Sequence, residues 1–326
     1  MNTFSFMNIQ GLCPQTKPSS IPYIRDILNT ENHLFLGLTE TWLADSHKKA
    51  ELEINGYKLY RKDRVRTKSH WGRYSGGVAL YIREDIAPFF KPVLEFSNGV
   101  NEALMLYSKE YNPILCIIYR QPTNVKHKSD APEFMELINS VQSKIEAIEG
   151  CTPDLYISGD FNIPHTHSIS NDSYEPANSC NKQLLNILTD FMFHFNLNQI
   201  IHKPTHSNGN ILDFLLTNNT DSIFNYKSTP TIHSDHFIID VTTHLSFNTQ
   251  KKHMNEKNLN SKFDLYNFHS DKIDWEYLEK ELANVRWQKV LEPHQTDPDN
   301  QYKIFINKCL NVIEDKVPLK KVKKNS

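Results

Sequence analysis

Polar side chains of the kinds that bind cations or transfer protons follow several apolar runs of this sequence. Asp160 and Asn162 come directly after the run 155–157, with Gly159 between them and the run. We expect the strand to stop at Gly159, because glycine lets a backbone turn sharply or approach a ligand closely. Charged and amide groups at the end of a buried strand cost free energy unless they are paired or coordinate something. Asp, Asn and Gly are also ordinary turn formers, so this segment alone leaves both interpretations open.

The same arrangement recurs at the ends of other apolar runs. Six segments share it, and the side chains that they carry are Asn8, Glu40, Tyr119, Asp160 with Asn162, Asp213, and Asp235 with His236. Asp213 lies within an apolar run, where a carboxylate needs a partner. We expect that partner to be His236, whose imidazole tautomer the pair would fix. Random placement of turn formers would not give this regularity, so the repetition favours one converging site.

Apolar patterning predicts the elements that must position these side chains. Alternating or continuous apolar runs predict strands over residues 3–9, 34–38, 76–82, 101–107, 114–119, 155–157, 211–217 and 237–239. Helical spacing of apolar residues predicts helices over 20–28, 132–148 and 183–195. The helix 132–148 stands between two predicted strands, which indicates a strand–helix–strand unit. A hairpin is expected at Asn112-Pro113.

Residues 57–74 are the most basic stretch, with aromatic residues interleaved. Its cations are Lys58, Arg61, Lys62, Arg64, Arg66, Lys68 and Arg73. Basic residues mixed with aromatics suit a phosphate backbone with nearby bases. A solvated loop beside a strand edge would have the same composition, so both interpretations stay open.

Composition bounds the class of protein. The chain has 326 residues, 39% hydrophobic and 11% aromatic, which suits one large domain plus an appendage. No apolar stretch approaches the length of a membrane span, so no membrane partner is expected. Five cysteines without a CxxC spacing argue against a disulfide scaffold or structural zinc, and for a reducing intracellular compartment. Residues 1–245 carry a net charge of −5, which is compatible with a cation-dependent site and does not itself indicate nucleic-acid binding.

The last eighty residues differ in character from the rest. Strong strand patterns stop near residue 247, and from residue 263 the chain becomes helical and amphipathic. Residues 246–326 carry a net charge of +3, and the chain ends in a lysine cluster over 320–324. That cluster is either a nuclear signal or the basic end of a linker.

In chain order, six motifs resemble those of the endonuclease/exonuclease/phosphatase family. They are Asn8-Ile9-Gln10, Thr39-Glu40-Thr41-Trp42, Tyr119-Arg120-x-Pro122, Gly159-Asp160-Phe161-Asn162, Leu212-Asp213-Phe214 and Ser234-Asp235-His236. Any one motif is weak, but six in order over about residues 3–245 are strong. Within the family, residues 38–43 and 205–213 look most like the apurinic-type endonuclease domains of non-LTR retrotransposons (LINE elements).

The resemblance implies an α/β fold of four layers, two facing mixed β-sheets with helices outside, over residues 1–246. It also implies that residues 247–326 are a polar linker and helical extension like the connector to a reverse transcriptase. The chain would then be truncated before that enzyme, which would be its partner in a full-length element.

The resemblance assigns a role to each site residue. Glu40, Asn8 and Asp235 would hold Mg²⁺, with Mn²⁺ as a substitute, because hard cations take oxygen ligands. Asp160 would activate water, and Asn162 and Tyr119 would contact the phosphate and its transition state. His236, oriented by Asp213, would share in proton transfer. The residues assigned to contact DNA are Lys62, Arg64, Arg120 and Asn208.

The function implied is a Mg²⁺-dependent endonuclease that cuts double-stranded DNA to a 3′-hydroxyl and a 5′-phosphate, as a nuclear monomer. Two alternatives stay open. One is a phosphoesterase of the same fold that acts on a small molecule, although residues 210–213 lack the Trp-Cys-Asp-Arg run of inositol phosphatases. The other is a catalytically idle, transposon-derived binding protein, against which every motif residue is intact.

Overall fold

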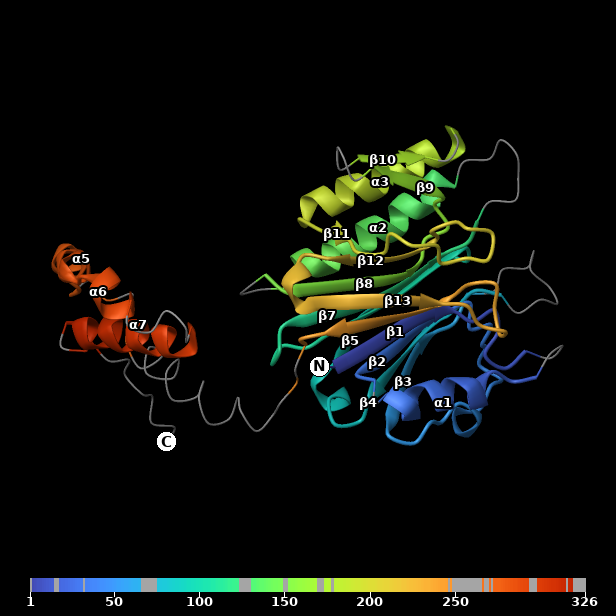
Figure 1. Ribbon diagram of the computed structural model, residues 1–326, viewed down its shortest axis with the longest axis horizontal. Coiled ribbons are helices and arrows are strands. Elements are labelled where there is room, and N and C mark those ends of the chain that lie inside the picture. Colours follow the sequence, from blue (N-terminus) through green and yellow to red (C-terminus); the bar gives the residue numbers. More distant parts are fainter. Residues whose placement is uncertain are drawn as a thin grey trace. The chain divides into compact units, whose positions relative to one another are not determined.

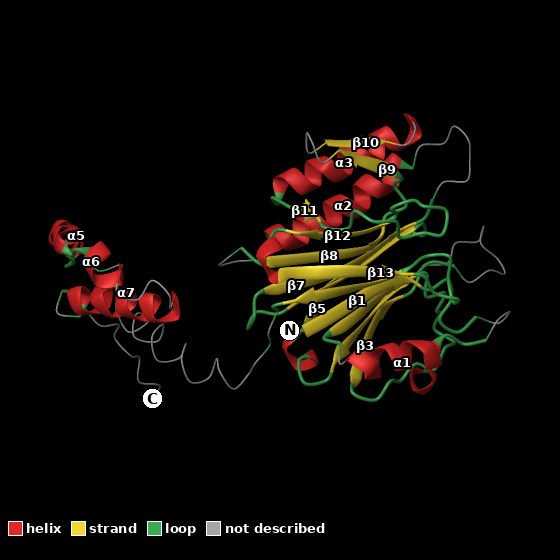
Figure 2. Ribbon diagram, viewed as in Figure 1, coloured by secondary structure: helices red, strands yellow, loops and turns green. Residues whose placement is uncertain are grey.

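Two six-stranded β-sheets face each other in the first 246 residues of the computed structural model (Figures 1 and 2). The structure describes residues 2–14, 18–31, 33–65, 75–122, 130–148, 152–168, 173–176, 179–245, 247, 266, 270, 272–292, 298–314 and 316–318. Residue contacts divide the chain into two compact units, Met1–Ser246 and Phe247–Ser326.

The first sheet has its N-terminal strand near its centre. Its order is β13 (Ile223–Thr229), β14 (Ile238–Thr243), β1 (Asn2–Asn8), β2 (Phe35–Thr39), β4 (Val78–Arg83) and β3 (Tyr57–Lys62). Strand β1 pairs in parallel with β2 and antiparallel with β14. The C-terminal ends of β1 and β2 therefore reach the same edge as the N-terminal end of β14.

The second sheet contains the predicted strand–helix–strand unit. Its order is β11 (Asn198–Gln199), β12 (Asp213–Thr217), β8 (Asp154–Asp160), β7 (Pro113–Arg120), β6 (Asn101–Tyr107) and β5 (Lys91–Ser97). Strands β7 and β8 are parallel and are joined by helix α2 (Ala131–Glu146), which confirms the unit. Strands β6 and β7 form the predicted hairpin. A separate two-stranded sheet consists of β9 (His165–Ser168) and β10 (Ser173–Pro176).

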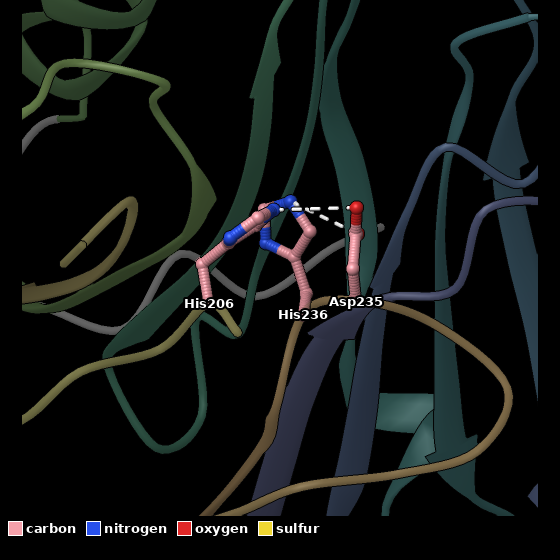
Figure 3. A group of neighbouring side chains, drawn as sticks. All are labelled: His206, Asp235 and His236. Carbon is pink, nitrogen blue, oxygen red and sulfur yellow. Dashed lines mark ion pairs between the residues drawn. The ribbon is translucent and has the colours of Figure 1, made fainter. Parts of the chain in front are cut away.

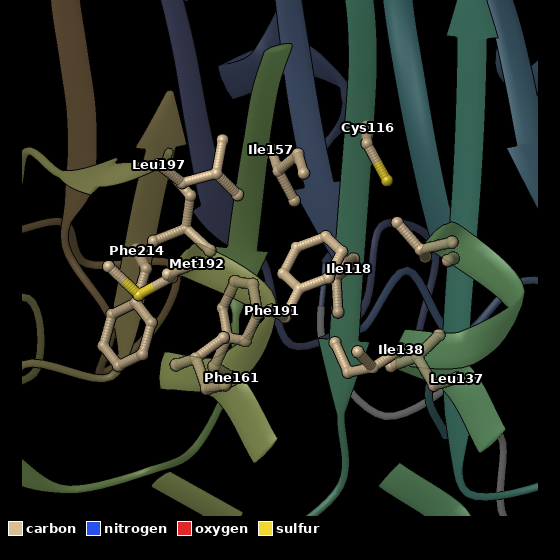
Figure 4. Packing of buried hydrophobic residues seen from close by; sticks show 14 of the residues in the cluster. Cys116, Ile118, Leu137, Ile138, Ile157, Phe161, Phe191, Met192, Leu197 and Phe214 are labelled. Carbon is tan, nitrogen blue, oxygen red and sulfur yellow. The ribbon is translucent and has the colours of Figure 1, made fainter. Parts of the chain in front are cut away.

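Helices cover the outer faces of both sheets. On the first sheet, Ile24 and Leu28 of α1 (Ile21–Glu31) pack with Met7 and Leu36 in one buried cluster. On the second, α2 and α3 (Ser179–His194) pack against β7, β8 and β12 in a larger cluster that Figure 4 shows from close by. Between the sheets, the Phe4 ring meets Tyr156 edge-on at 6.2 Å. The four-layered sandwich expected from the sequence is confirmed.

Strand β8 corrects one expectation about Gly159. The strand runs through Gly159 to Asp160 instead of stopping there. Gly159 has a φ of +135°, and a Cβ at this position would lie 1.9 Å from the carbonyl oxygen of Ile118 in β7. The glycine therefore permits close packing of two parallel strands and makes no turn.

Several strands gave no clear sequence signal. Strands β3, β5 and β13 lie at sheet edges and carry mostly part-buried or exposed residues. Edge strands of mixed polarity lack the apolar run that predicts a buried strand. The first unit also has short 3₁₀ turns at Lys49–Glu51, Ala87–Phe89 and Thr220–Ser222.

The second unit is helical, as predicted for the C-terminal extension. It contains α5 (Trp275–Asn284), α6 (Trp287–Leu291) and α7 (Pro298–Ile313). The side chain of Asp274 caps α5 by accepting a hydrogen bond from the backbone N–H of Tyr277. Leu278, Leu310 and Ile313 belong to a small buried cluster. The terminal lysines lie outside the described residues, and none of the described helices is long and apolar enough to cross a membrane.

Candidate active site

Strand ends from both sheets place the predicted catalytic side chains at one end of the sandwich. In the second sheet, Asp160 is paired in register with Tyr119 on one side and with Asp213 on the other. In the first sheet, Asn8 is paired with Thr39, so Glu40 follows at the same level. The strand pairings thus bring three acidic groups, a phenol and an amide to one end of the sandwich.

Asp160 is the buried centre of this group, with no exposed surface. Its Oδ2 accepts hydrogen bonds from Nδ2 of Asn8 at 2.9 Å and from Nδ2 of Asn162 at 2.8 Å. Its Oδ1 accepts the backbone N–H of Asn162 at 3.0 Å. Nε2 of His236 lies 3.7 Å from Oδ2.

The environment of Asp160 favours its protonated form. Burial, and then the negative charge of Asp213, raise the pKa of Asp160 to about 8, against the opposing effects of His236 and of the hydrogen bond from Asn8. In its ionised form, a carboxylate with a raised pKa binds a proton more strongly than an ordinary aspartate, which suits it to accept one from water. This is the property that a general base needs.

Glu40 is joined to Asp160 through a single amide. Nδ2 of Asn8 donates to Oε1 of Glu40 at 2.9 Å, the same distance at which it donates to Asp160. The hydroxyl of Tyr119 donates to Oε1 of Glu40 at 3.0 Å. Burial, followed by the charges of Glu40 and Asp160, raises the pKa of Tyr119, so the phenol stays a hydrogen-bond donor.

The backbone around these side chains is strained. Six described residues other than glycine have a positive φ, and four of them adjoin the site: Gln10 (48°), Glu40 (50°), Trp42 (54°) and Asn162 (50°). Left-handed conformations of such residues cost free energy and cluster at functional sites. Two hydrogen bonds hold the turn at Asn162, because its N–H donates to Asp160 and its Nδ2 donates to the carbonyl oxygen of Arg120 at 2.8 Å.

His236 and Asp213 form the predicted couple. Nδ1 of His236 lies 2.8 Å from Oδ2 of Asp213, and both residues are buried. Because a carboxylate only accepts, Nδ1 carries a proton and Nε2 faces the site. Burial acts to lower the pKa of His236, but the charge of Asp213 and its hydrogen bond, with Asp160 and Asp235, raise it to about 10. His236 is therefore an imidazolium at neutral pH.

Asp235 lies on the histidine side of the site. Its Oδ1 is 4.0 Å from Nε2 of His236, and its Oδ2 is 3.3 Å from Nε2 of His206 (Figure 3). The side chain of Asp235 is 46% exposed, in contrast to the buried Asp160. Asp235 is therefore far more accessible to solvent than Asp160.

The residues present fit a divalent cation. Among the described residues, two groups of three have ligand atoms within 4.8 Å of one another: Asp160, Asp213 and His236, and His206, Asp235 and His236. Glu40 belongs to neither group, but its carboxylate and that of Asp160 converge on the nitrogen of Asn8. One buried carboxylate oxygen, Oδ1 of Asp213, has no hydrogen-bond partner. An excess of oxygen donors over positive charge is the donor set that hard cations prefer.

Asn8 is oriented as a donor and not as a ligand. The backbone N–H of Gln10 donates to its Oδ1 at 3.1 Å, which leaves Nδ2 facing the two carboxylates. Coordination of a cation by Oδ1, which we expected from the resemblance, would require this side chain to rotate. Its role as a metal ligand stays a prediction.

The four predicted DNA contacts are placed differently from one another. Lys62 is part-exposed at the end of β3, and Asn208 is exposed in the 205–210 hairpin. Lys62 lines a pocket of about 500 Å³ whose walls mix basic and acidic side chains. The carboxylates of Glu40 and Asp160 are not part of this lining. Arg64 and Arg120 are buried, at 8% and 2% exposure, and this placement does not support a contact with DNA. Residues 66–74 of the basic stretch lie outside the described residues.

Arg120 has a structural role instead. Its Nε donates to the carbonyl oxygen of Phe161 at 2.7 Å, its Nη2 donates to that of Asn162, and its Nη1 pairs with Asp130. These bonds fasten the turn after β8 to the end of β7 and to the start of α2. Arg120, next to Tyr119 in the sequence, thus supports the turn that carries Asn162.

Sequence reasoning gave no separate role to two residues that touch the site. The indole Nε1 of Trp42 donates to Oε2 of Glu40 at 3.0 Å. His206 contacts Asp235 from the hairpin that precedes Asp213. The sequence could have indicated both residues. Trp42 lies in the motif 39–42 and His206 lies in the segment 205–213, and each side chain can donate a hydrogen bond.

Comparisons with known proteins identify the family and the fold of the chain. The sequence model of the Endonuclease/Exonuclease/phosphatase family matches residues 7–236. A search of curated protein sequences gives no match.

Similar solved structures include an AP endonuclease from Leishmania major (13% identity, TM-score 0.51, covering 75% of this chain and 89% of that one). A 3′-5′ exonuclease from Neisseria meningitidis has 14% identity and a TM-score of 0.54, covering 74% of this chain and 100% of that one. An AP endonuclease from Archaeoglobus fulgidus has 10% identity and a TM-score of 0.51, covering 75% and 100%. At these identities the likeness shows the fold.

Proposed function

The chain belongs to the endonuclease/exonuclease/phosphatase family, whose members hydrolyse phosphoester bonds, and we propose that it is a Mg²⁺-dependent endonuclease that nicks double-stranded DNA. The observation that carries the proposal is the arrangement around Asp160. A buried carboxylate with a pKa raised to about 8 lies 3.7 Å from a histidine that a second carboxylate orients. This couple can remove a proton from water and stabilise negative charge on a phosphate.

Each group has a role that follows from its contacts. Asp160 accepts the proton of the attacking water, whose oxygen forms the new bond to phosphorus. Nε2 of His236, protonated at neutral pH, donates to a phosphate oxygen and supplies the proton that the leaving O3′ needs. The phosphorus–O3′ bond breaks, which leaves a 3′-hydroxyl and a 5′-phosphate. Asn162 and Tyr119 are hydrogen-bond donors for the charge that develops on the phosphate.

The residues that would hold the cation are Glu40 and Asp235. Glu40 and Asp235 supply the oxygen ligands, and a bound Mg²⁺ would supply positive charge that stabilises the phosphate in the transition state. Asn8 holds Glu40 and Asp160 in place by donating to both. Without a cation, this part of the site has more negative than positive charge.

The proposal extends to the origin of the chain. Its motifs resemble those of a target-nicking domain of a non-LTR retrotransposon, and its second unit is helical like the connector to a reverse transcriptase. A 3′-hydroxyl at the nick is the primer that such an element requires. A nuclear location and a reverse transcriptase partner belong to this proposal.

Nicking of supercoiled plasmid by the full chain tests the proposed reaction. We expect open-circle product with Mg²⁺, and none with EDTA or in the Asp160→Asn variant, which keeps the shape of the side chain. Absence of product from a folded protein that binds Mg²⁺ would contradict the endonuclease. Phosphate release from small monoesters under the same conditions would then favour the phosphoesterase alternative.

A further inference from the structure

Two loops at the site are locked together by backbone hydrogen bonds. His206 and His236 form an antiparallel bridge. The N–H of Ser207 donates to the carbonyl oxygen of Asp235 at 2.9 Å, and that of Phe237 donates to Thr205 at 2.7 Å. The 205–210 hairpin is therefore fixed in register with the segment that carries Asp235, and the side chain of His206 lies beside the carboxylate of Asp235 (Figure 3).

The hydrogen bonds of His206 determine which ring nitrogen carries its proton. The backbone N–H of Asn208 donates to Nδ1 of His206 at 3.2 Å. A backbone N–H can only donate, so Nδ1 presents its lone pair and the proton of the neutral ring is on Nε2. Nε2 is the atom that lies 3.3 Å from Oδ2 of Asp235. The protonated nitrogen of His206 therefore lies against a carboxylate oxygen of Asp235.

This contact restrains a carboxylate that would otherwise be mobile. The side chain of Asp235 is 46% exposed, whereas that of His206 is only 15% exposed. With Oδ2 held by His206, Oδ1 is the oxygen on the side of His236, at 4.0 Å from its Nε2. We propose that His206 is a positioning residue, which holds Asp235 so that its Oδ1 faces the cation and the substrate phosphate.

The same bonds argue against His206 as a metal ligand, although His206, Asp235 and His236 lie close enough to hold an ion. Coordination through Nε2 would require the proton to be on Nδ1, where it would meet the N–H of Asn208. The geometry therefore assigns His206 to the outer partners that orient a ligand. This inference rests on the proposed function, because Asp235 is the cation ligand that His206 would serve.

Two isosteric variants separate positioning from loop structure. In His206→Gln, the side-chain amide nitrogen can occupy the place of Nε2, so the donor to Asp235 is kept and the acceptor for Asn208 is lost. In His206→Asn, the amide oxygen can occupy the place of Nδ1, so the loop acceptor is kept and the donor is lost. His206→Ala loses both.

The readout is Mn²⁺ binding to the full chain by titration calorimetry, without DNA, beside the melting temperature in EDTA. We expect His206→Asn and His206→Ala to weaken Mn²⁺ binding about tenfold, and His206→Gln to stay within about twofold of wild type. The melting temperature should rank His206→Gln and His206→Asn the other way round. His206→Gln should melt lower than His206→Asn, because only His206→Asn keeps the loop hydrogen bond.

Three results would overturn the proposal. His206→Asn could bind Mn²⁺ like wild type, the Mn²⁺ affinities could follow the melting temperatures, or His206→Gln could lose binding as fully as His206→Ala, as expected for a direct ligand. The proposed function and the positioning role of His206 can be contradicted independently. A chain that shows the expected order of Mn²⁺ affinities but does not nick plasmid would keep the positioning role and lose the endonuclease.

Discussion

Arg64 and Glu102 form a buried ion pair, with 2.7 Å between Nε and Oε1, directly behind the site. The guanidinium lies over the ring of Tyr119, 5.4 Å from its centroid, and Nη2 also donates to Oε2 of Glu102. Glu102 in turn accepts the N–H of Gly77, whose carbonyl oxygen accepts the N–H of Thr41 beside Glu40. The pair therefore packs against Tyr119, which donates to Glu40, and is linked through Gly77 to Thr41, the residue after Glu40.

Loss of Arg64 should destabilise the fold. Arg64→Ala leaves the carboxylate of Glu102 buried without its cation, which costs about 3–5 kcal/mol. Lys62→Ala, two residues away and part-exposed, should change the free energy of unfolding by less than about 0.5 kcal/mol. Denaturant unfolding measures both. Equal effects in the two variants would contradict the structural role, and Arg64→Met with Glu102→Gln should recover most of the loss.

Asp160→Asn should abolish nicking and remove the contribution of Asp160 to the pH dependence of stability. The folded state holds the proton of Asp160 up to about pH 8, whereas an exposed Asp loses it near its ordinary pKa of 3.8. Stability that is present at low pH is therefore lost as the pH rises from about 4 to about 8. Thermal melts in EDTA should show this decline in wild type and a flatter profile in Asp160→Asn, and parallel profiles would contradict the raised pKa.

His236 extends the same trend to higher pH. Its folded pKa is raised from 6.5 to about 10, so its contribution is complete below pH 6.5 and is lost as the pH rises toward 10. In Asp213→Asn, the carboxylate that orients and charges the imidazole is absent, and we expect nicking to fall at least about a hundredfold. Asp221→Asn, an exposed acid in the 3₁₀ turn 220–222, is the matched control and should nick like wild type.

Gly159→Ala should prevent folding. The added Cβ would meet a backbone oxygen that cannot move without separating β7 from β8, so we expect a loss of more than about 4 kcal/mol. Gly56→Ala provides the comparison, because Gly56 also has a positive φ of +82° but has no atom within 4 Å of a built Cβ. Its cost should be about 1 kcal/mol, from backbone strain alone. Soluble expression and unfolding curves of the two variants test this difference.

The strands that carry the site could be predicted because they are buried and read as apolar runs. The predicted Asp213–His236 couple is a hydrogen bond in the structure, since a carboxylate within such a run needs a partner. The structural roles of Arg64 and Arg120 could not be predicted, because composition does not show whether a cation points to solvent or to a buried carbonyl. Gly159 was misinterpreted for a similar reason, since a turn and a close strand contact both favour glycine.

The pairing of β1 with β14 sets the order in which the site can be completed during synthesis. Residues 2–6 are synthesised long before residues 239–243, which are their pairing partners on one side. Until residues 239–243 are made, β1 is paired only with β2 and lacks β14. A nascent chain of that length carries Asp160 without His236. A chain terminated before this point lacks both β14 and His236. The site can therefore be assembled only after nearly all of the first unit has been translated.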